Sequence, residues 1–246
     1  MRPFSQAPSD ASPSLEKLVG SGVDVRTILS FYVAPKLLHD MLPPGWELDS
    51  PAPGPLGDAN LRVTFVDQLQ ASVPGASAQE PIRYVLFSIP MRKADPATKA
   101  TLLFTGLSTG GKGPYEVNAK ATALVERKSV SSIGGTRTES ATWKFRSDDG
   151  ISASLDIEYL PGAVQREQAE ARTYSAAKSG FHRIYRYDQC IDVISGPQRS
   201  ARLKEIDFRA AGGVLSSLFD GNEQLISVAS VLWFARQVFL PVASNT

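Results

Sequence analysis

The segment from Gly106 to Arg127 constrains the fold of this chain more than any other. It reads G-L-S-T-G-G-K-G-P-Y-E-V-N-A-K-A-T-A-L-V-E-R, a glycine-rich turn followed by a strictly alternating run. Successive side chains of a strand point to opposite faces. The run therefore predicts a long strand with a face of small apolar residues (Val117, Ala119, Ala121, Ala123, Val125) and a polar face (Glu116, Asn118, Lys120, Thr122, Glu126). Such a strand could line a small-molecule cavity, or it could be an ordinary barrel strand with a solvated face.

The rest of the chain predicts many further strands separated by regularly spaced turn signals, and little helix. The expected strands cover residues 23–33, 60–68, 82–90, 101–107, 136–146, 151–160, 181–194, 201–209 and 225–240. Short helices are expected at 34–42 and 214–219, one helical turn at 14–19, and a surface helix or crossing loop at 162–178. This pattern is typical of a mainly β protein with an antiparallel barrel or sandwich rather than alternating strand–helix units. We expect a flexible N-terminal arm over residues 1–14 and a single domain over 15–246.

Composition narrows the classes of partner. The 246 residues include 26 basic and 25 acidic side chains, well mixed along the chain, for a formal net charge of +1. This balance argues against a nucleic-acid or anionic-membrane partner, because either would require a basic patch or stripe. No apolar run is long enough for a membrane-spanning helix. The N-terminus lacks the apolar region of a secretory signal. A cytoplasmic protein is the resulting expectation.

Few residues offer metal or cofactor chemistry. The single cysteine, Cys190, excludes an intramolecular disulfide and a cysteine-based zinc site, and it lies in an apolar stretch typical of a buried thiol. His39 and His182 do not form a closely spaced ligand pair. The chain contains no phosphate-binding loop, dinucleotide fingerprint, nucleophile elbow or zinc-protease motif. We therefore expect no cofactor and no metal.

Two other clusters each allow two interpretations. The turn around Lys112 could present backbone N–H groups to an anion, but it lacks the following helix of a phosphate loop, which favours a tight turn. Arg183, Arg186 and Asp188 lie among two tyrosines, Tyr185 and Tyr187. This group could bind a carboxylate, but a cross-strand ladder of ion pairs on a solvated face is favoured.

Three stretches together resemble the acetoacetate decarboxylase family. They are T-I-L-S-F-Y-V-A-P-K-L-L-H-D-M-L-P-P-G-W-E-L-D-S-P at 27–51, the turn and strand at 110–127, and a series in the C-terminal half at 183–194, 203–208, 218–220 and 239–241. The resemblance covers most of the chain in pattern and is weak in identity. It implies a cone-like antiparallel β-barrel that encloses a small cavity, often in a homo-oligomer.

The chain departs from this family at the catalytic position. The family carries a Tyr/Phe-Pro-Lys-Lys segment, whose first lysine forms a Schiff base and is activated by a neighbouring cation. With Tyr115 aligned on the family's aromatic residue, Val117 falls on the nucleophile and Asn118 on its partner. Lys120 could supply a displaced lysine, but without an adjacent cation. Classical decarboxylation by a lysine Schiff base is therefore not expected.

Two functional hypotheses remain open. In the first, the chain is an enzyme that acts on a small carbonyl or carboxylate compound. Asn118 would polarise a carbonyl and Glu116 or Glu80 would move a proton, with Lys120, Arg62 and Arg83 as further candidates and with Tyr115, Val117 and Ala119 lining the cavity.

In the second hypothesis, the small inward side chains form an apolar cavity that binds a hydrophobic small molecule without chemistry. A third, simpler interpretation is a barrel filled by its own aromatic residues, Phe65, Phe87, Phe104, Trp143 and Trp233. The three differ in what the interior of the barrel contains.

Overall fold

The computed structural model describes residues 16–49, 58–76, 79–95, 98–197 and 202–241, so the predicted arm over 1–14 lies outside the described residues. Within these ranges neither helix has the length and apolar character needed to cross a membrane. The elements, in chain order, are β1 (Glu16–Tyr32), α1 (Lys36–His39), β2 (Trp46–Leu48), β3 (Leu61–Ser72), β4 (Arg83–Lys93), β5 (Lys99–Ser108), β6 (Asn118–Ser131), β7 (Arg137–Ser147), β8 (Ser152–Tyr159), β9 (Gln165–Ser175), β10 (His182–Ser195), β11 (Leu203–Ala211), α2 (Leu215–Leu218) and β12 (Gln224–Pro241).

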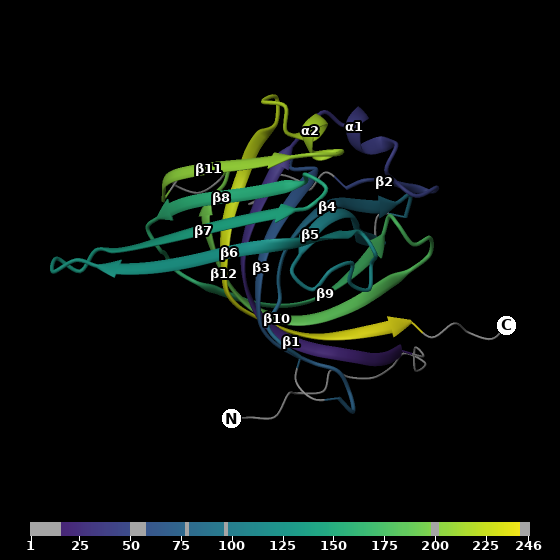
Figure 1. The fold of residues 1–246 in the computed structure, drawn as a ribbon, viewed down its shortest axis with the longest axis horizontal. Helices are drawn as coiled ribbons and strands as arrows, with labels where there is room; N and C mark the ends of the chain where they lie inside the picture. The colour runs from purple at the N-terminus through teal and green to yellow at the C-terminus, as the bar shows by residue number, and fades with distance from the viewer. Residues whose placement is uncertain (1–15, 50–57, 77–78, 96–97, 198–201, 242–246) are drawn as a thin grey trace.

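Seven of these strands close into a barrel (Figure 1). The hydrogen-bonded order runs β5-β9-β10-β12-β1-β3-β4, and β4 pairs again with β5. All of these pairings are antiparallel except the one between β5 and β9, which joins only residues 101–103 to 173–175. The barrel is therefore closed by its shortest strand pairing, the one between β5 and β9. Beyond that contact, the edge of β9 that faces away from β10 has no strand partner in the described part of the chain.

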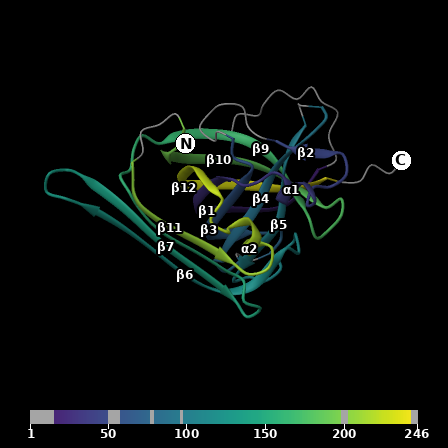
Figure 2. The same ribbon diagram turned by 90° about the horizontal axis from the view of Figure 1, so that it is seen from above.

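A second sheet continues from the barrel wall. Strand β6 pairs in parallel with β5 over three residues and then leaves the barrel to form the antiparallel sheet β6-β7-β8-β11. The far half of the β6–β7 hairpin extends beyond the rest of the molecule (Figures 1 and 2). The fold is thus a barrel with a four-stranded sheet laid against part of its wall. The expectation of a mainly β architecture with a few short helices is confirmed.

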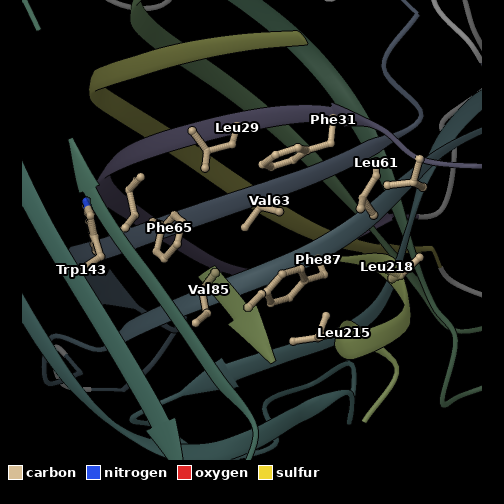
Figure 3. Close-up of a cluster of buried hydrophobic side chains, with 14 of the residues drawn as sticks. Leu29, Phe31, Leu61, Val63, Phe65, Val85, Phe87, Trp143, Leu215 and Leu218 are labelled. Carbon is tan, nitrogen blue, oxygen red and sulfur yellow. The ribbon is translucent and has the colours of Figure 1, made fainter. Parts of the chain in front are cut away.

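The hydrophobic core lies between these two layers and not inside the barrel. Alternate residues of β1, β3 and β4 point outward from the barrel and pack against the second sheet and α2 (Figure 3). The ring of Phe65 on β3 lies 5.7 Å from that of Trp143 on β7, and Phe31 on β1 lies 5.1 Å from Phe208 on β11. Leu215 and Leu218 of α2 close one end of this core. Because strand side chains alternate, the intervening residues of the same strands must face the barrel interior.

Two segments adopt a structure other than the predicted one. Residues 162–178 were expected as a helix or crossing loop, but most of them form β9. Both faces of β9 are polar, since one faces the polar barrel interior and the other faces solvent, so the usual apolar alternation is absent. Residues 16–19 were expected as a helical turn and instead begin β1, which pairs with the last strand β12 from Glu16 onward.

Candidate functional site

The barrel encloses a cavity of about 660 Å³. Its walls come from alternate residues of every barrel strand, for example Arg62 and Thr64 of β3, and Tyr185 and Tyr187 of β10. The glycine-rich turn between β5 and β6 also borders the cavity, where Gly111 and Gly113 have positive φ values of 77° and 62°. A cavity of this volume can hold a metabolite-sized ligand.

The lining combines apolar side chains, such as Ile28, Val66 and Leu86, with polar ones, and it is rich in arginine. Four guanidinium groups, those of Arg26, Arg62, Arg183 and Arg236, line the cavity, whereas no lysine of the described ranges does. The aromatic residues Phe65, Phe87, Phe104, Trp143 and Trp233 do not line it. The simpler interpretation of a barrel filled by these aromatic side chains is therefore wrong: Phe65, Phe87 and Trp143 belong to the core outside the barrel, and Phe104 packs against that core.

Two of the arginines share one buried carboxylate. Asp24, which is fully buried, forms ion pairs with both Arg26 and Arg236. Arg236 also donates to Gln68 Oε1 at 2.9 Å and to the Tyr84 hydroxyl at 3.2 Å. The Arg26 guanidinium lies over a ring, 3.4 Å from the centroid of Phe234. This network fixes both arginines in the wall and leaves them little freedom to turn toward a ligand.

Arg62 is different because it has no partner of its own. Among the described residues, its guanidinium makes no hydrogen bond and no ion pair, although protein surrounds it. Burial lowers the pKa of Arg62 from its ordinary value, and nearby Arg26 acts in the same direction, whereas Tyr187 and Glu167 raise it. Glu167 itself accepts a hydrogen bond of 2.7 Å from Gln189. An arginine held in an enclosed cavity without a bound carboxylate is suited to an anionic ligand.

A second polar group lies around the glycine-rich turn. The hydroxyls of Tyr115 and Tyr185 are 2.8 Å apart. Burial raises the pKa of Tyr115 well above its ordinary value, the neighbouring Tyr185 adds to this effect, and Arg183 opposes it. The Tyr115 backbone carbonyl accepts a hydrogen bond of 2.5 Å from Ser175, which ties the turn to the end of β9. Tyr115 is therefore held in its neutral form, with its hydroxyl hydrogen-bonded to that of Tyr185.

Unsatisfied polar atoms concentrate at the cavity. In the described ranges, four buried side-chain polar atoms lack a hydrogen-bond partner, and three of them belong to the cavity-lining residues Ser30, Asn118 and Arg183. Buried polar groups in native proteins almost always have partners. Their concentration here indicates that the cavity is built to be filled by water or by a polar ligand.

The structure brings four of the sequence-predicted residues together at the cavity and separates the others from it. Arg62, Tyr115, Val117 and Asn118 line the cavity. Ala119 does not, although the alternation placed it beside Val117. Strand β6 pairs with the barrel only at its beginning, so the small apolar face of Ala119 packs against the hydrophobic core instead.

The charged candidates of the predicted site lie outside the cavity. Lys120 is exposed on the outer face of β6, and Glu80 is also exposed. Glu116 has a left-handed backbone, with φ of 61°, and forms an exposed ion pair of 3.3 Å with Lys178. Arg83 is half-exposed and lies 3.3 Å from Asp67. None of these four residues lines the cavity.

The cluster on β10 divides between the two faces of its strand. Arg183, Tyr185 and Tyr187 line the cavity. Arg186 and Asp188 form ion pairs on the other face, Arg186 with Glu16 and Glu170, and Asp188 with Arg166. The predicted ladder of ion pairs is therefore present on the outer face, and carboxylate binding by the inner face stays a prediction.

Sequence reasoning missed Arg26, Arg236 and Glu167. Arg26 had a detectable signal, since charged residues at alternate positions of an apolar strand indicate a polar interior. The other two had none, because their partners come from distant parts of the chain.

Comparison with known proteins shows the fold. No family model matches the chain, and no curated protein matches its sequence. Among solved structures, the enduracididine biosynthesis enzyme MppR is 11% identical with a TM-score of 0.54, covering 97% of this chain and 95% of that one. Acetoacetate decarboxylase from Legionella pneumophila is 12% identical with a TM-score of 0.53, covering 98% and 94%.

A third structure is an acetoacetate decarboxylase-like enzyme from Sphingomonas wittichii RW1, at 8% identity and a TM-score of 0.54, which covers 98% of this chain and 100% of that one. At such identities the likeness concerns the fold alone. The predicted acetoacetate decarboxylase-like barrel is confirmed.

Proposed function

We propose that this chain is an enzyme that binds a small keto acid inside its barrel, with the carboxylate of the substrate on Arg62, and transforms it without a lysine Schiff base. The observation that carries the proposal is the guanidinium of Arg62, which lines the cavity and forms no ion pair within the described residues. A carboxylate that accepts two hydrogen bonds from it would fill the role that Asp24 fills for Arg26 and Arg236.

The other lining groups suit acid–base chemistry at a carbonyl. The side-chain N–H groups of Asn118, which lines the cavity, can donate a hydrogen bond to the substrate's carbonyl oxygen or to a bound water. The neutral phenol of Tyr115 can donate a hydrogen bond to a developing oxyanion, and the carboxylate of Glu167 can accept a proton. No lysine lines the cavity to form an imine. One of the similar structures is MppR complexed with pyruvate, which supports a small keto acid as the ligand class.

The alternative function, a barrel that binds a hydrophobic molecule without chemistry, fits the cavity less well. Arg62 and Arg183 form no ion pair within the described residues, so an apolar ligand would leave both charges without a counter-charge, and desolvating an unpaired charge is costly.

The test is calorimetric titration of a panel of keto acids, including pyruvate and acetoacetate, followed by proton NMR of the mixtures. Arg62→Met is expected to weaken binding of the acids by about tenfold or more. The control is Arg92→Met, an exposed arginine 3.8 Å from Glu47 outside the cavity, which is expected to bind like wild type. Equal affinity of the Arg62 and Arg92 variants for the keto acids would show that Arg62 does not bind the carboxylate. Binding without any change in the NMR spectrum would favour a binding protein over an enzyme.

A further inference from the structure

Arg183 is a second arginine in the cavity whose charge is not compensated. Its Nε atom is buried and has no hydrogen-bond partner. Within the described residues its guanidinium forms no ion pair, and its nearest aromatic ring is that of Phe181, with the centroid 6.0 Å away. Because no carboxylate among the described residues offsets the charge of this guanidinium, an anion at the cavity end of the side chain would be stabilised.

The two uncompensated arginines lie at different places in the cavity. Arg183 acts on the pKa of Tyr115, beside the glycine-rich turn. Arg62 acts on the pKa of Tyr187, close to Arg26 and Glu167. Arg183 and Tyr187 are four residues apart on the same face of β10, so their α-carbons are separated by about 13 Å of strand. One small anion cannot neutralise both guanidinium groups from a single end of the cavity.

The charges of the cavity wall point to the same conclusion. Four guanidinium groups line the cavity, and two carboxylates are placed to offset them: Glu167, in the lining, and the buried Asp24. The four guanidinium groups therefore exceed the two carboxylates by two positive charges. Since a cavity walled by protein screens charge less than bulk water does, a ligand that supplies two negative charges is favoured.

From this arrangement we infer that the substrate is a keto dicarboxylate, with one carboxylate on Arg62 and the other on Arg183. The inference rests on the proposed function and narrows its substrate class. Inorganic phosphate carries the same total charge, but it places that charge on one compact group and would satisfy only one of the two arginines. The keto group would then lie along the wall between them, near Tyr185.

The experiment compares ligands that differ by one carboxylate. The affinities of α-ketoglutarate and α-ketoadipate are measured by calorimetry against those of α-ketovalerate and α-ketocaproate, which have the same chain lengths and one carboxylate each. Inorganic phosphate is a further arm. The proteins are the full chain, Arg183→Met, and Arg172→Met, an exposed arginine of β9 that lies 3.9 Å from Glu170 and outside the cavity lining.

We expect at least one dicarboxylate to bind wild type about tenfold tighter than its monocarboxylate counterpart. Arg183→Met should remove that advantage and leave the monocarboxylate affinity unchanged, and Arg172→Met should preserve it. If wild type bound each dicarboxylate only as tightly as the monocarboxylate of the same length, the inference would be overturned. Binding of a single carboxylate by Arg62 would not be affected by that result, which requires no variant. Phosphate binding tighter than either dicarboxylate would also overturn it. Absence of binding by all four acids would refute the proposed function together with the inference.

Discussion

The side-chain amide oxygen of Asn118 lies directly against the α-carbon of Gly106, its pairing partner between β6 and β5. A Cβ at Gly106 would overlap that oxygen and would lie 2.7 Å from the carbonyl oxygen of Val85. The absence of a side chain at Gly106 therefore makes room for Asn118 where the second sheet leaves the barrel.

Gly106→Ala is expected to destabilise the protein by about 1–3 kcal/mol, because the Val85 carbonyl belongs to the barrel backbone and cannot move away. Gly134→Ala is the matched control, since the nearest atom to its Cβ would be 4.0 Å away. Chemical denaturation of both variants measures the difference. Equal stability of the two variants would mean that the close approach of Asn118 does not exclude a side chain at position 106.

Asp24→Asn tests the buried network that holds Arg26 and Arg236. It leaves two buried guanidinium groups without their shared carboxylate, and the expected loss in the free energy of unfolding is about 3–5 kcal/mol. Asp207→Asn, at an exposed pair with Arg209, is expected to change stability little. If thermal unfolding of the two variants shifted equally, the Asp24 network would be unimportant for the fold.

The pKa of Tyr115 leads to a spectroscopic prediction. Burial raises this pKa above its ordinary value of 10.0, so the folded state prefers the neutral phenol. This preference stabilises the fold fully below the ordinary pKa and is lost as the pH rises through the raised one.

At about pH 11, folded wild type and Tyr115→Phe are therefore expected to show the same tyrosinate absorbance, whereas in denaturant wild type shows one tyrosinate more. A lower absorbance of the folded variant at that pH would mean that Tyr115 ionises normally.

The absence of lysine from the cavity lining predicts that borohydride traps nothing there. Wild type incubated with each keto acid of the panel and then reduced should keep its intact mass, because Lys120 is exposed outside the barrel interior. Lys120→Ala is treated in parallel. A mass gain in wild type that disappears in this variant would show Schiff-base chemistry on a displaced lysine.

The sequence predicts the strands that border the hydrophobic core better than those that border only the cavity. The alternation in β3 and β4 is clear because one face packs in the core. In β9 both faces are polar, so no apolar period distinguishes it from a surface helix. Ala119 shows a second limit of local pattern. The alternation places it on the apolar face of its strand, but the pattern does not tell whether that face borders a cavity or, as the structure shows, the hydrophobic core.

The candidate site is predicted only in part for a related reason. Arg62 and Asn118 lie in or beside recognisable strands and were identified. The pairing of Asp24 with Arg236 joins positions 212 residues apart, and nothing local in either strand reveals it. Which arginines are left without a partner, the property on which the proposed function rests, depends on such pairings and emerges only from the closed barrel.

A crystal structure of the protein with a keto acid bound tests the account most directly. The account predicts density for the acid inside the barrel, with its carboxylate within hydrogen-bonding distance of the Arg62 guanidinium and no covalent link to a lysine. Density that joins the acid to Lys120, or an acid bound only outside the barrel while Arg62 faces an empty cavity, would contradict it.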